Sequence, residues 1–159
     1  MQLTRAADYG VRVMMYLAGR PEGERRLLPT LAEATGAPES FLSKVLQALT
    51  RAHLISSWRG KSGGFAILPE GRSASLYDVI EAVDGPIRLN VCLVPGQNCG
   101  RKSFCPAHPV WARAQQAMMD VLTKASISEL AGGMAAPECA AGLETLAPAG
   151  KDSAHLSGV

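Results

Sequence analysis

Apolar side chains recur every three or four residues near the start of the chain, which is the spacing that gives a helix one buried face. Tyr9, Val13 and Leu17 mark this face, and Thr4 precedes it as a candidate N-cap. Glycine and proline follow in quick succession directly afterwards, where they favour a turn. The pattern therefore predicts a first helix over residues 3–18.

Two further helices are predicted after this turn. The Thr30 hydroxyl and the Glu33 carboxylate have capping-box spacing, so a short helix is expected over residues 30–35. Gly36 can adopt the positive φ that ends a helix, and Pro38 suits the first turn of the next one. The buried face of that third helix is predicted from its apolar positions, Phe41, Val45, Leu46 and Leu49. Two helices joined by a glycine-containing turn are typical of a helix-turn-helix.

Two short apolar segments come next, with a basic, glycine-rich turn between them. Residues 54–58 and 65–68 are predicted to be antiparallel strands, and residues 59–64 the turn that joins them. A β-hairpin after three helices predicts a winged helix, whose third helix enters the major groove of DNA while the hairpin contacts phosphate or the minor groove.

The exposed polar residues of this unit are candidates for contacting DNA. They are four residues of the third helix and two of the turn, Ser40, Ser43, Lys44, Gln47, Arg59 and Lys61. The guanidinium of Arg59 suits the negative potential of a narrow minor groove, and Lys61 suits a phosphate. For the helix residues, an ordinary solvated face is the alternative interpretation.

The second half of the chain contains further amphipathic helices. One is expected over residues 75–83, with Ser75 as its N-cap. A longer helix repeats apolar residues at intervals of three and four, as in helices that pack along another helix. These residues form a candidate dimer interface, Trp111, Ala114, Met118, Val121 and Ala125. Packing of this helix on its own domain is the alternative. Ser126 and Glu129 predict a short last helix, and residues 133–159 have the composition of a disordered tail.

Composition and charge narrow the class of protein. The 159 residues are 47% hydrophobic and 19% charged, as in ordinary globular domains, and no apolar run approaches the ~20 residues that span a bilayer. Arg5, Asp8 and Arg12 interrupt any signal-peptide pattern, so a cytoplasmic protein without a membrane segment is expected. Residues 1–69 carry nine Lys and Arg against five Asp and Glu, a surplus that slightly favours a polyanionic partner.

Three of the four cysteines and one histidine fall within seventeen residues. Cys92, Cys99, Cys105 and His108 share a segment rich in glycine, proline and asparagine, which favour turns. In a reducing cytoplasm, clustered thiols are metal ligands or redox switches more often than disulfides. Soft thiolate ligands suit iron-sulfur clusters or zinc. The spacing therefore predicts a metal site in this loop.

Three motifs together resemble the Rrf2 family of bacterial winged-helix regulators. They are Met1-Gln-Leu-Thr4 with Ala7-Asp-Tyr-Gly10, Arg59-Gly-Lys-Ser-Gly-Gly64 and the three-cysteine loop, and the resemblance covers about residues 1–131. It implies a homodimeric transcription regulator, expected to be a repressor, that binds double-stranded operator DNA through its third helix and wing. It also implies an iron-sulfur cluster that reports nitric oxide, redox state or the supply of iron and clusters, although some members carry no cluster.

The resemblance also implies which residues hold the cluster. Cys92, Cys99 and Cys105 match the three thiolate positions of the family, in keeping with the preference of such clusters for sulfur. The fourth ligand stays open. His108 matches a histidine that completes a 2Fe-2S site in one branch, and Asp8 matches an aspartate that binds a 4Fe-4S cluster across the dimer in another. Each also has a plain role, Asp8 as a favourable charge near a helix N-terminus and His108 as a polar residue at a helix start.

Other classes of protein fit the sequence less well. It contains neither a nucleophile elbow nor a phosphate-binding glycine loop between a strand and a helix, which argues against an enzyme. An iron-sulfur electron carrier would leave the winged helix without a purpose, and a structural zinc site would favour shorter cysteine spacings. A cluster-free switch, in which two of the three cysteines form a disulfide, is the nearest alternative.

The sequence as a whole predicts a mainly α-helical fold with a small β-hairpin wing, in which a winged helix-turn-helix precedes a long C-terminal dimerisation helix. The expected organisation is a DNA-binding domain over residues 1–84 and a cluster-binding loop over residues 85–108. The dimerisation helix and the short last helix follow over residues 109–132, and the tail occupies residues 133–159.

Overall fold

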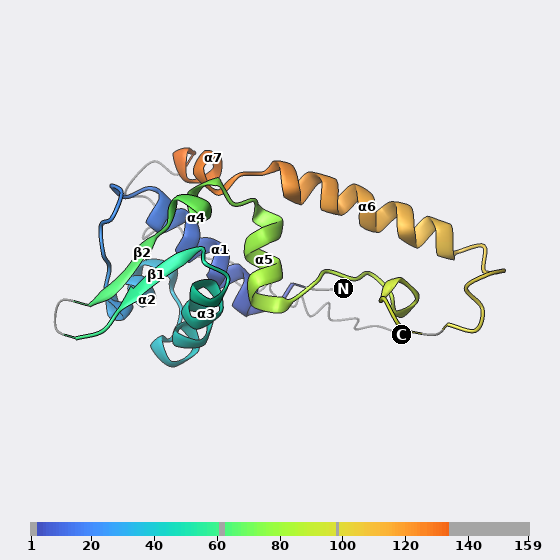
Figure 1. Cartoon of the computed structure of the whole chain (residues 1–159), viewed down its shortest axis with the longest axis horizontal. Helices are drawn as coiled ribbons and strands as arrows, with labels where there is room; N and C mark the ends of the chain where they lie inside the picture. Colours follow the sequence, from blue (N-terminus) through green and yellow to red (C-terminus); the bar gives the residue numbers. More distant parts are fainter. Residues whose placement is uncertain (1–2, 61–62, 98, 134–159) are drawn as a thin grey trace, which may run out of the picture.

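The computed structural model describes residues 3–60, 63–97 and 99–133, which form a helical body with one two-stranded sheet (Figure 1). In chain order its elements are α1 (Arg5–Ala18), α2 (Leu28–Thr35), α3 (Glu39–Arg51), β1 (Ile55–Trp58), β2 (Gly64–Ile67), α4 (Pro69–Ser73), α5 (Leu76–Asp84), the short 3-10 helix η1 (Val91–Leu93), α6 (His108–Lys124) and α7 (Ile127–Gly132). The mainly α-helical fold with a hairpin wing is confirmed. Most of the predicted tail and Lys61 lie outside the described residues.

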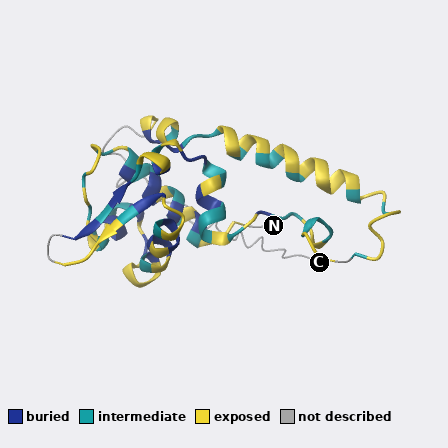
Figure 2. Cartoon of the chain, in the orientation of Figure 1, coloured by how far each residue is buried: buried dark blue, intermediate teal, exposed yellow. Residues whose placement is uncertain are grey.

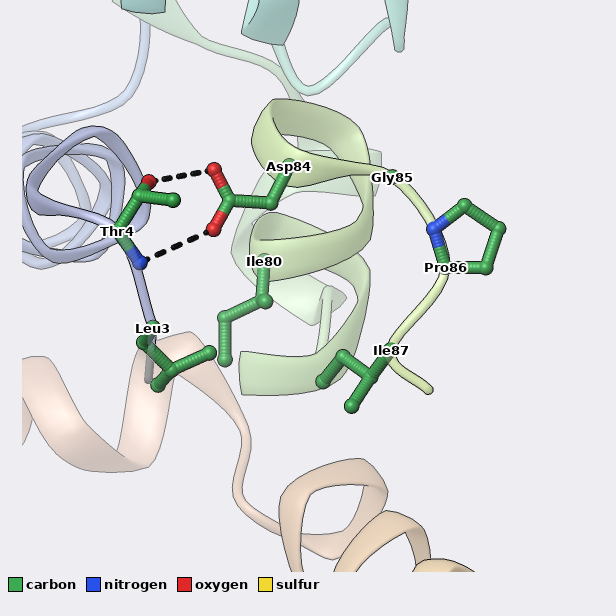
Figure 3. Close-up of a pocket in the computed structure, with 7 residues that line it drawn as sticks. All are labelled: Leu3, Thr4, Ile80, Asp84, Gly85, Pro86 and Ile87. Carbon is green, nitrogen blue, oxygen red and sulfur yellow. Dashed lines mark hydrogen bonds between the residues drawn. The ribbon is translucent and has the colours of Figure 1, made fainter. Parts of the chain in front are cut away.

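The start of α1 is fixed by one side chain, as the sequence predicts. The Thr4 hydroxyl accepts a hydrogen bond from the backbone N–H of Ala7 at 3.2 Å and so caps the helix. Thr4 also donates twice to the Asp84 carboxylate at the end of α5, from its backbone N–H at 3.2 Å and its hydroxyl at 2.6 Å (Figure 3). These bonds tie the first residues of α1 to the point where the chain leaves α5.

The helix-turn-helix is present, but α2 begins earlier than the sequence predicts. Its first residue is Leu28, so Thr30 lies inside the first turn and caps nothing, and the predicted capping box is wrong. Pro29 explains the difference, because proline is well tolerated in the first turn, where a backbone N–H has no partner in the helix. Gly36 ends α2 with φ 67°, as predicted.

The core lies between α1, α3 and α5. It includes Val13, Met14 and Leu17 of α1, and the α3 residues Leu42, Val45, Leu46 and Leu49, all with at most 3% of their surface exposed. The expected burial of Phe41 is wrong: its side chain is 39% exposed and packs edge-to-face on Tyr9, with ring centroids 5.7 Å apart. Leu42 occupies the buried position instead, because it lies on the same helix face as Val45, Leu46 and Leu49.

The wing is an antiparallel hairpin that carries one additional partner. Ile55 pairs with Ile67 at its base and Trp58 with Gly64 at its outer end. Arg26, in the segment between α1 and α2, forms an isolated antiparallel bridge with Phe65 of β2. The segment before α2 is therefore attached to the edge of the wing.

The short helix α4 was not predicted from the sequence, and it holds the end of α1. The guanidinium of Arg72 donates to the Ala18 and Arg20 carbonyl oxygens, at 2.8 Å and 2.6 Å. Gly71, in the same helix, is buried against the backbone of Leu54, where β1 begins. α4 therefore fixes the wing relative to α1.

Replacing Gly71 with alanine is expected to destabilise the protein by about 3 kcal/mol, because a core that is already packed cannot accept an added atom without shifting. The new methyl group would collide with the Leu54 carbonyl oxygen and lie 3.0 Å from Cγ1 of Ile67. Denaturant unfolding measures the change in the free energy of unfolding. Gly132→Ala is the matched control, since nothing lies within 4 Å of its added methyl group. Equal stability of the two variants would contradict the assigned packing.

The last two helices are joined to the body by a backbone clamp. Leu76 donates to the Ala125 carbonyl at 2.8 Å and Ile127 donates to the Ala74 carbonyl at 2.9 Å, on either side of a bridge between Ser75 and Ser126. Ile127 is fully buried in the main core, so α7 packs with the N-terminal helices. From this clamp α6 extends away from the body, and the cysteine loop lies near its far end (Figure 1).

Among the described residues, no helix combines the length and hydropathy needed to cross a bilayer.

Candidate functional site

One face of α3 presents the predicted polar residues to solvent. Ser40, Lys44 and Gln47 are exposed and Ser43 is half-buried, while the apolar face of the same helix packs into the core. The core thus holds α3 by its apolar face, and the opposite face presents hydrogen-bond donors and acceptors to solvent. This is the arrangement that direct readout of base edges requires.

The outer end of the wing carries positive charge. Arg59 follows β1 directly and is exposed. The guanidinium of Arg25 lies 4.1 Å from the centre of the Trp58 ring, while Arg26 pairs with Glu24. Sequence reasoning missed Arg25, because only the Arg26–Phe65 bridge brings the segment between α1 and α2 beside the hairpin.

The cysteine loop is a series of local turns. Backbone hydrogen bonds join Cys99 to Lys102 at 2.9 Å and Cys105 to His108 at 3.2 Å. All three cysteines, Cys92, Cys99 and Cys105, are half-buried free thiols. One bond fastens the start of the loop to α6, from the backbone N–H of Leu89 to Oε1 of Gln115 at 3.1 Å.

The predicted ligands do not converge within one chain. Over the described residues, no three cysteine, histidine or acidic side chains lie close enough together to hold a metal ion. Asp8 is in the first turn of α1 and forms an ion pair with Arg12 at 2.8 Å, in line with its plain electrostatic role. His108 is the first residue of α6, and its Nδ1 is buried without a hydrogen-bond partner among the described residues.

These donors fit an iron-sulfur cluster in their chemistry. Thiolates are the usual protein ligands of such clusters, and an imidazole nitrogen is a suitable additional donor. The three thiols stand on one short loop that is held mainly by hydrogen bonds between close neighbours, so few distant contacts oppose its rearrangement around a bound group.

The long helix α6 has a large free surface (Figure 2). None of its 17 residues is buried. Met118 and Leu122 face the body and pack on a small cluster with Ile80 and Ile87, so Met118 contacts its own chain. The other predicted interface residues are exposed, except Ala125, which is half-buried at the clamp. An apolar stripe remains uncovered along the helix, formed by Val110, Ala114, Ala117 and Val121, with Trp111 at its border.

The hollow drawn in Figure 3 lacks the features of a catalytic centre. It has a volume of about 200 Å³ and lies between the start of α1 and the end of α5. Its carboxylate, Asp84, is occupied by two hydrogen bonds from Thr4, and its other lining side chains are apolar.

Comparison with known proteins agrees with a winged-helix transcriptional regulator. Residues 3–133 match the family model Rrf2, described as an iron-dependent transcriptional regulator. The protein aau3 of Rhizobium meliloti is 33% identical over 131 residues, which are 82% of this chain and 84% of that protein. MT1325 of Mycobacterium tuberculosis, named as an HTH-type transcriptional regulator, is 31% identical over 138 residues, 87% of this chain and 85% of that protein.

Solved structures show the same fold. CymR of Staphylococcus aureus superposes with a TM-score of 0.63 at 28% identity, covering 80% of this chain and 96% of that chain. Its oxidised form gives the same TM-score of 0.63 and the same 28% identity. Because the family match spans all the described residues and MT1325 is named as a transcriptional regulator, the chain belongs to the Rrf2 family of DNA-binding transcriptional regulators.

Proposed function

We infer that this protein is a cytoplasmic, homodimeric repressor whose affinity for operator DNA is set by an iron-sulfur cluster. The observation that supports the cluster is the set of three half-buried free thiols on one loop, which leads into His108, whose buried Nδ1 has no hydrogen-bond partner among the described residues. The iron dependence in the description of the matched family supports it.

Residues 1–84 supply the DNA-binding surface in this proposal. Ser40, Ser43, Lys44 and Gln47 face base edges or phosphates in the major groove, because they occupy the free face of α3. Arg59 enters the minor groove, and Lys61 binds a phosphate.

Residues 85–108 hold the cluster through Cys92, Cys99 and Cys105, with Asp8 or His108 as the fourth ligand. When bound, an iron-sulfur cluster is chemically sensitive to oxidants, nitric oxide and iron supply, which is what a sensor needs. The cysteine loop changes its shape when the cluster changes, because short-range turns hold most of the loop. This change of shape reaches α6 through the Leu89–Gln115 bond and the turn before His108.

The choice of fourth ligand changes how this signal reaches DNA. With Asp8, which lies on α1, a cluster held by the partner's loop would join the DNA-binding domain of one protomer to the other protomer. With His108, all four ligands belong to one segment of one protomer. A change in the shape of the cysteine loop would then reach the DNA-binding domains through α6. In both cases the spacing of the two recognition helices must match half-sites about 34 Å apart.

The test is the affinity of operator DNA for protein purified without oxygen, before and after the iron is removed by a chelator. The probe is a duplex that the wild-type protein selects from a random-sequence pool. We expect at least a tenfold difference between the two forms, about 1.4 kcal/mol. Equal affinity would exclude an iron-sulfur sensor.

A thiol switch without a cluster is the second candidate. It is favoured by the likeness to CymR of Staphylococcus aureus, a structure of which was solved in an oxidised form. In this case iron-free protein would change its DNA affinity when peroxide is added and recover with dithiothreitol, and mass spectrometry would find a disulfide between two of Cys92, Cys99 and Cys105.

A further inference from the structure

We propose that Arg25 is a further DNA-contacting residue, which binds a backbone phosphate beside the wing and is held in place by the ring of Trp58. This rests on the proposed function, because it adds a contact to the same DNA-binding surface. Its basis is the geometry of the segment that joins α1 to α2.

The backbone fixes this segment against the wing. The Arg26 N–H donates to the Phe65 carbonyl at 2.9 Å, and the Phe65 N–H donates back to the Arg26 carbonyl at 2.9 Å. The approach is close, since a methyl group on Gly64 would lie 2.8 Å from the Arg26 carbonyl oxygen and 3.5 Å from Cβ of Arg25. The hydrogen bonds to the wing therefore fix the position of the Arg25 backbone.

The two neighbouring arginines have different electrostatic surroundings. Arg26 forms an ion pair with Glu24, and its side chain is 29% exposed. Arg25 is exposed, and its guanidinium lies over the Trp58 ring. Of the described carboxylates, none lies within ion-pairing distance of Arg25. A cation over an aromatic face keeps its charge, so the positive charge of Arg25 stays available to an external anion.

The anion that fits this place is a DNA phosphate. Arg59 directly follows Trp58 and is exposed, so the outer end of β1 carries two exposed arginines, Arg59 in the chain and Arg25 over the Trp58 ring. A wing that lies against DNA brings this end of the hairpin close to the sugar-phosphate backbone. Arginine contacts to phosphate fix the orientation of a protein on the duplex without reading bases. Arg25 thus anchors the wing while the α3 residues supply specificity.

The test is the salt dependence of DNA binding by the full-length protein, measured by fluorescence anisotropy on a duplex selected from a random pool. Arg25→Ala should weaken binding about tenfold and reduce the slope of log affinity against log salt concentration by about 1.8, for one phosphate per protomer of a dimer. Lys124→Gln removes an exposed charge at the C-terminal end of α6, outside the proposed DNA-binding residues, and should leave the slope unchanged. An unchanged slope for Arg25→Ala, with or without a lower melting temperature, would overturn the proposal.

Trp58 is a positioning residue, which a double-mutant cycle tests. Trp58→Leu should weaken binding about threefold in the wild-type background and add no loss to Arg25→Ala, whereas Trp58→Phe should restore most of the affinity. Additive losses would overturn the role of Trp58.

Arg59→Ala separates this inference from the proposed function. If Arg59→Ala weakens binding and Arg25→Ala does not, only the Arg25 contact is wrong. If the wild-type protein selects no duplex from the pool, the proposed function itself fails.

Discussion

Replacing Cys99 with alanine is expected to abolish iron and sulfide binding, and with it any difference in DNA affinity between the iron-loaded and chelator-treated protein. Removing one thiolate of three leaves the loop with too few soft ligands to retain a cluster. Iron, acid-labile sulfide and the visible absorption spectrum are measured on protein purified without oxygen. Cys139→Ala is the matched control, because Cys139 lies outside the predicted loop and should leave all three readings unchanged.

The same measurement on the wild-type protein decides the fourth ligand. About four iron and four sulfide per chain would indicate a 4Fe-4S cluster and favour Asp8, and about two of each would indicate a 2Fe-2S cluster and favour His108. Of the two variants Asp8→Ala and His108→Ala, only the one that removes the true fourth ligand should then lose the cluster. A full complement of iron and sulfide in Cys99→Ala would exclude this loop as the cluster site, and their absence from the wild-type protein would favour the thiol switch.

Two glutamates on the apolar stripe of α6 are expected to convert a dimer into monomers and to weaken operator binding at least about 100-fold. Ala114→Glu with Val121→Glu places charges where a second copy would bury apolar surface, and burying unpaired charges is costly. A monomer contacts a single half-site and loses the gain in affinity from simultaneous binding of two. Analytical ultracentrifugation gives the oligomeric state, and anisotropy gives the affinity.

The control for this experiment uses the opposite side of the same helix. Ala112→Glu with Thr123→Glu adds the same charge at exposed positions turned away from the stripe, and should leave both mass and affinity unchanged. A stable dimer of the stripe variant would show that α6 does not form the interface.

Local signals were sufficient to predict much of the fold. Thr4 and Ser75 cap the helices they were expected to cap, because an N-cap hydroxyl acts on a backbone N–H only two or three residues away. The error at Thr30 has an equally local cause, since Thr30 and Pro29 are both start signals and the proline lies nearer the true first residue, Leu28. Distant pairings could not be predicted: nothing in the sequence near Arg72 indicates that it binds the end of α1, more than fifty residues earlier.

In the candidate site too, local features could be predicted from the sequence and distant contacts could not. The cysteine spacing indicates the type of ligand, but the separation of Asp8 from the loop by more than eighty residues leaves its partner undetermined. Met118 was predicted in the interface by its spacing alone, and it is half-buried against Ile80 and Ile87 of its own chain, because the heptad pattern of one helix does not reveal which neighbours it meets. Arg25 was missed because its neighbour in space, Trp58, is thirty-three positions away.

The backbone clamp around Ser75 and Ser126 gives α6 the mechanics of a lever. The helix is anchored at its C-terminal end, while its N-terminal end carries His108, three residues after Cys105. Because Met118 and Leu122 pack on the body, the free arm is residues 108–117, about 15 Å long, so a 2 Å displacement of the cysteine loop corresponds to a tilt of about 8°. In a two-fold symmetric dimer joined along these arms, the angle between the two DNA-binding bodies would change by about twice that tilt. Under the proposed function, a chemical change at a few ligands would thereby rotate the two DNA-binding bodies relative to each other.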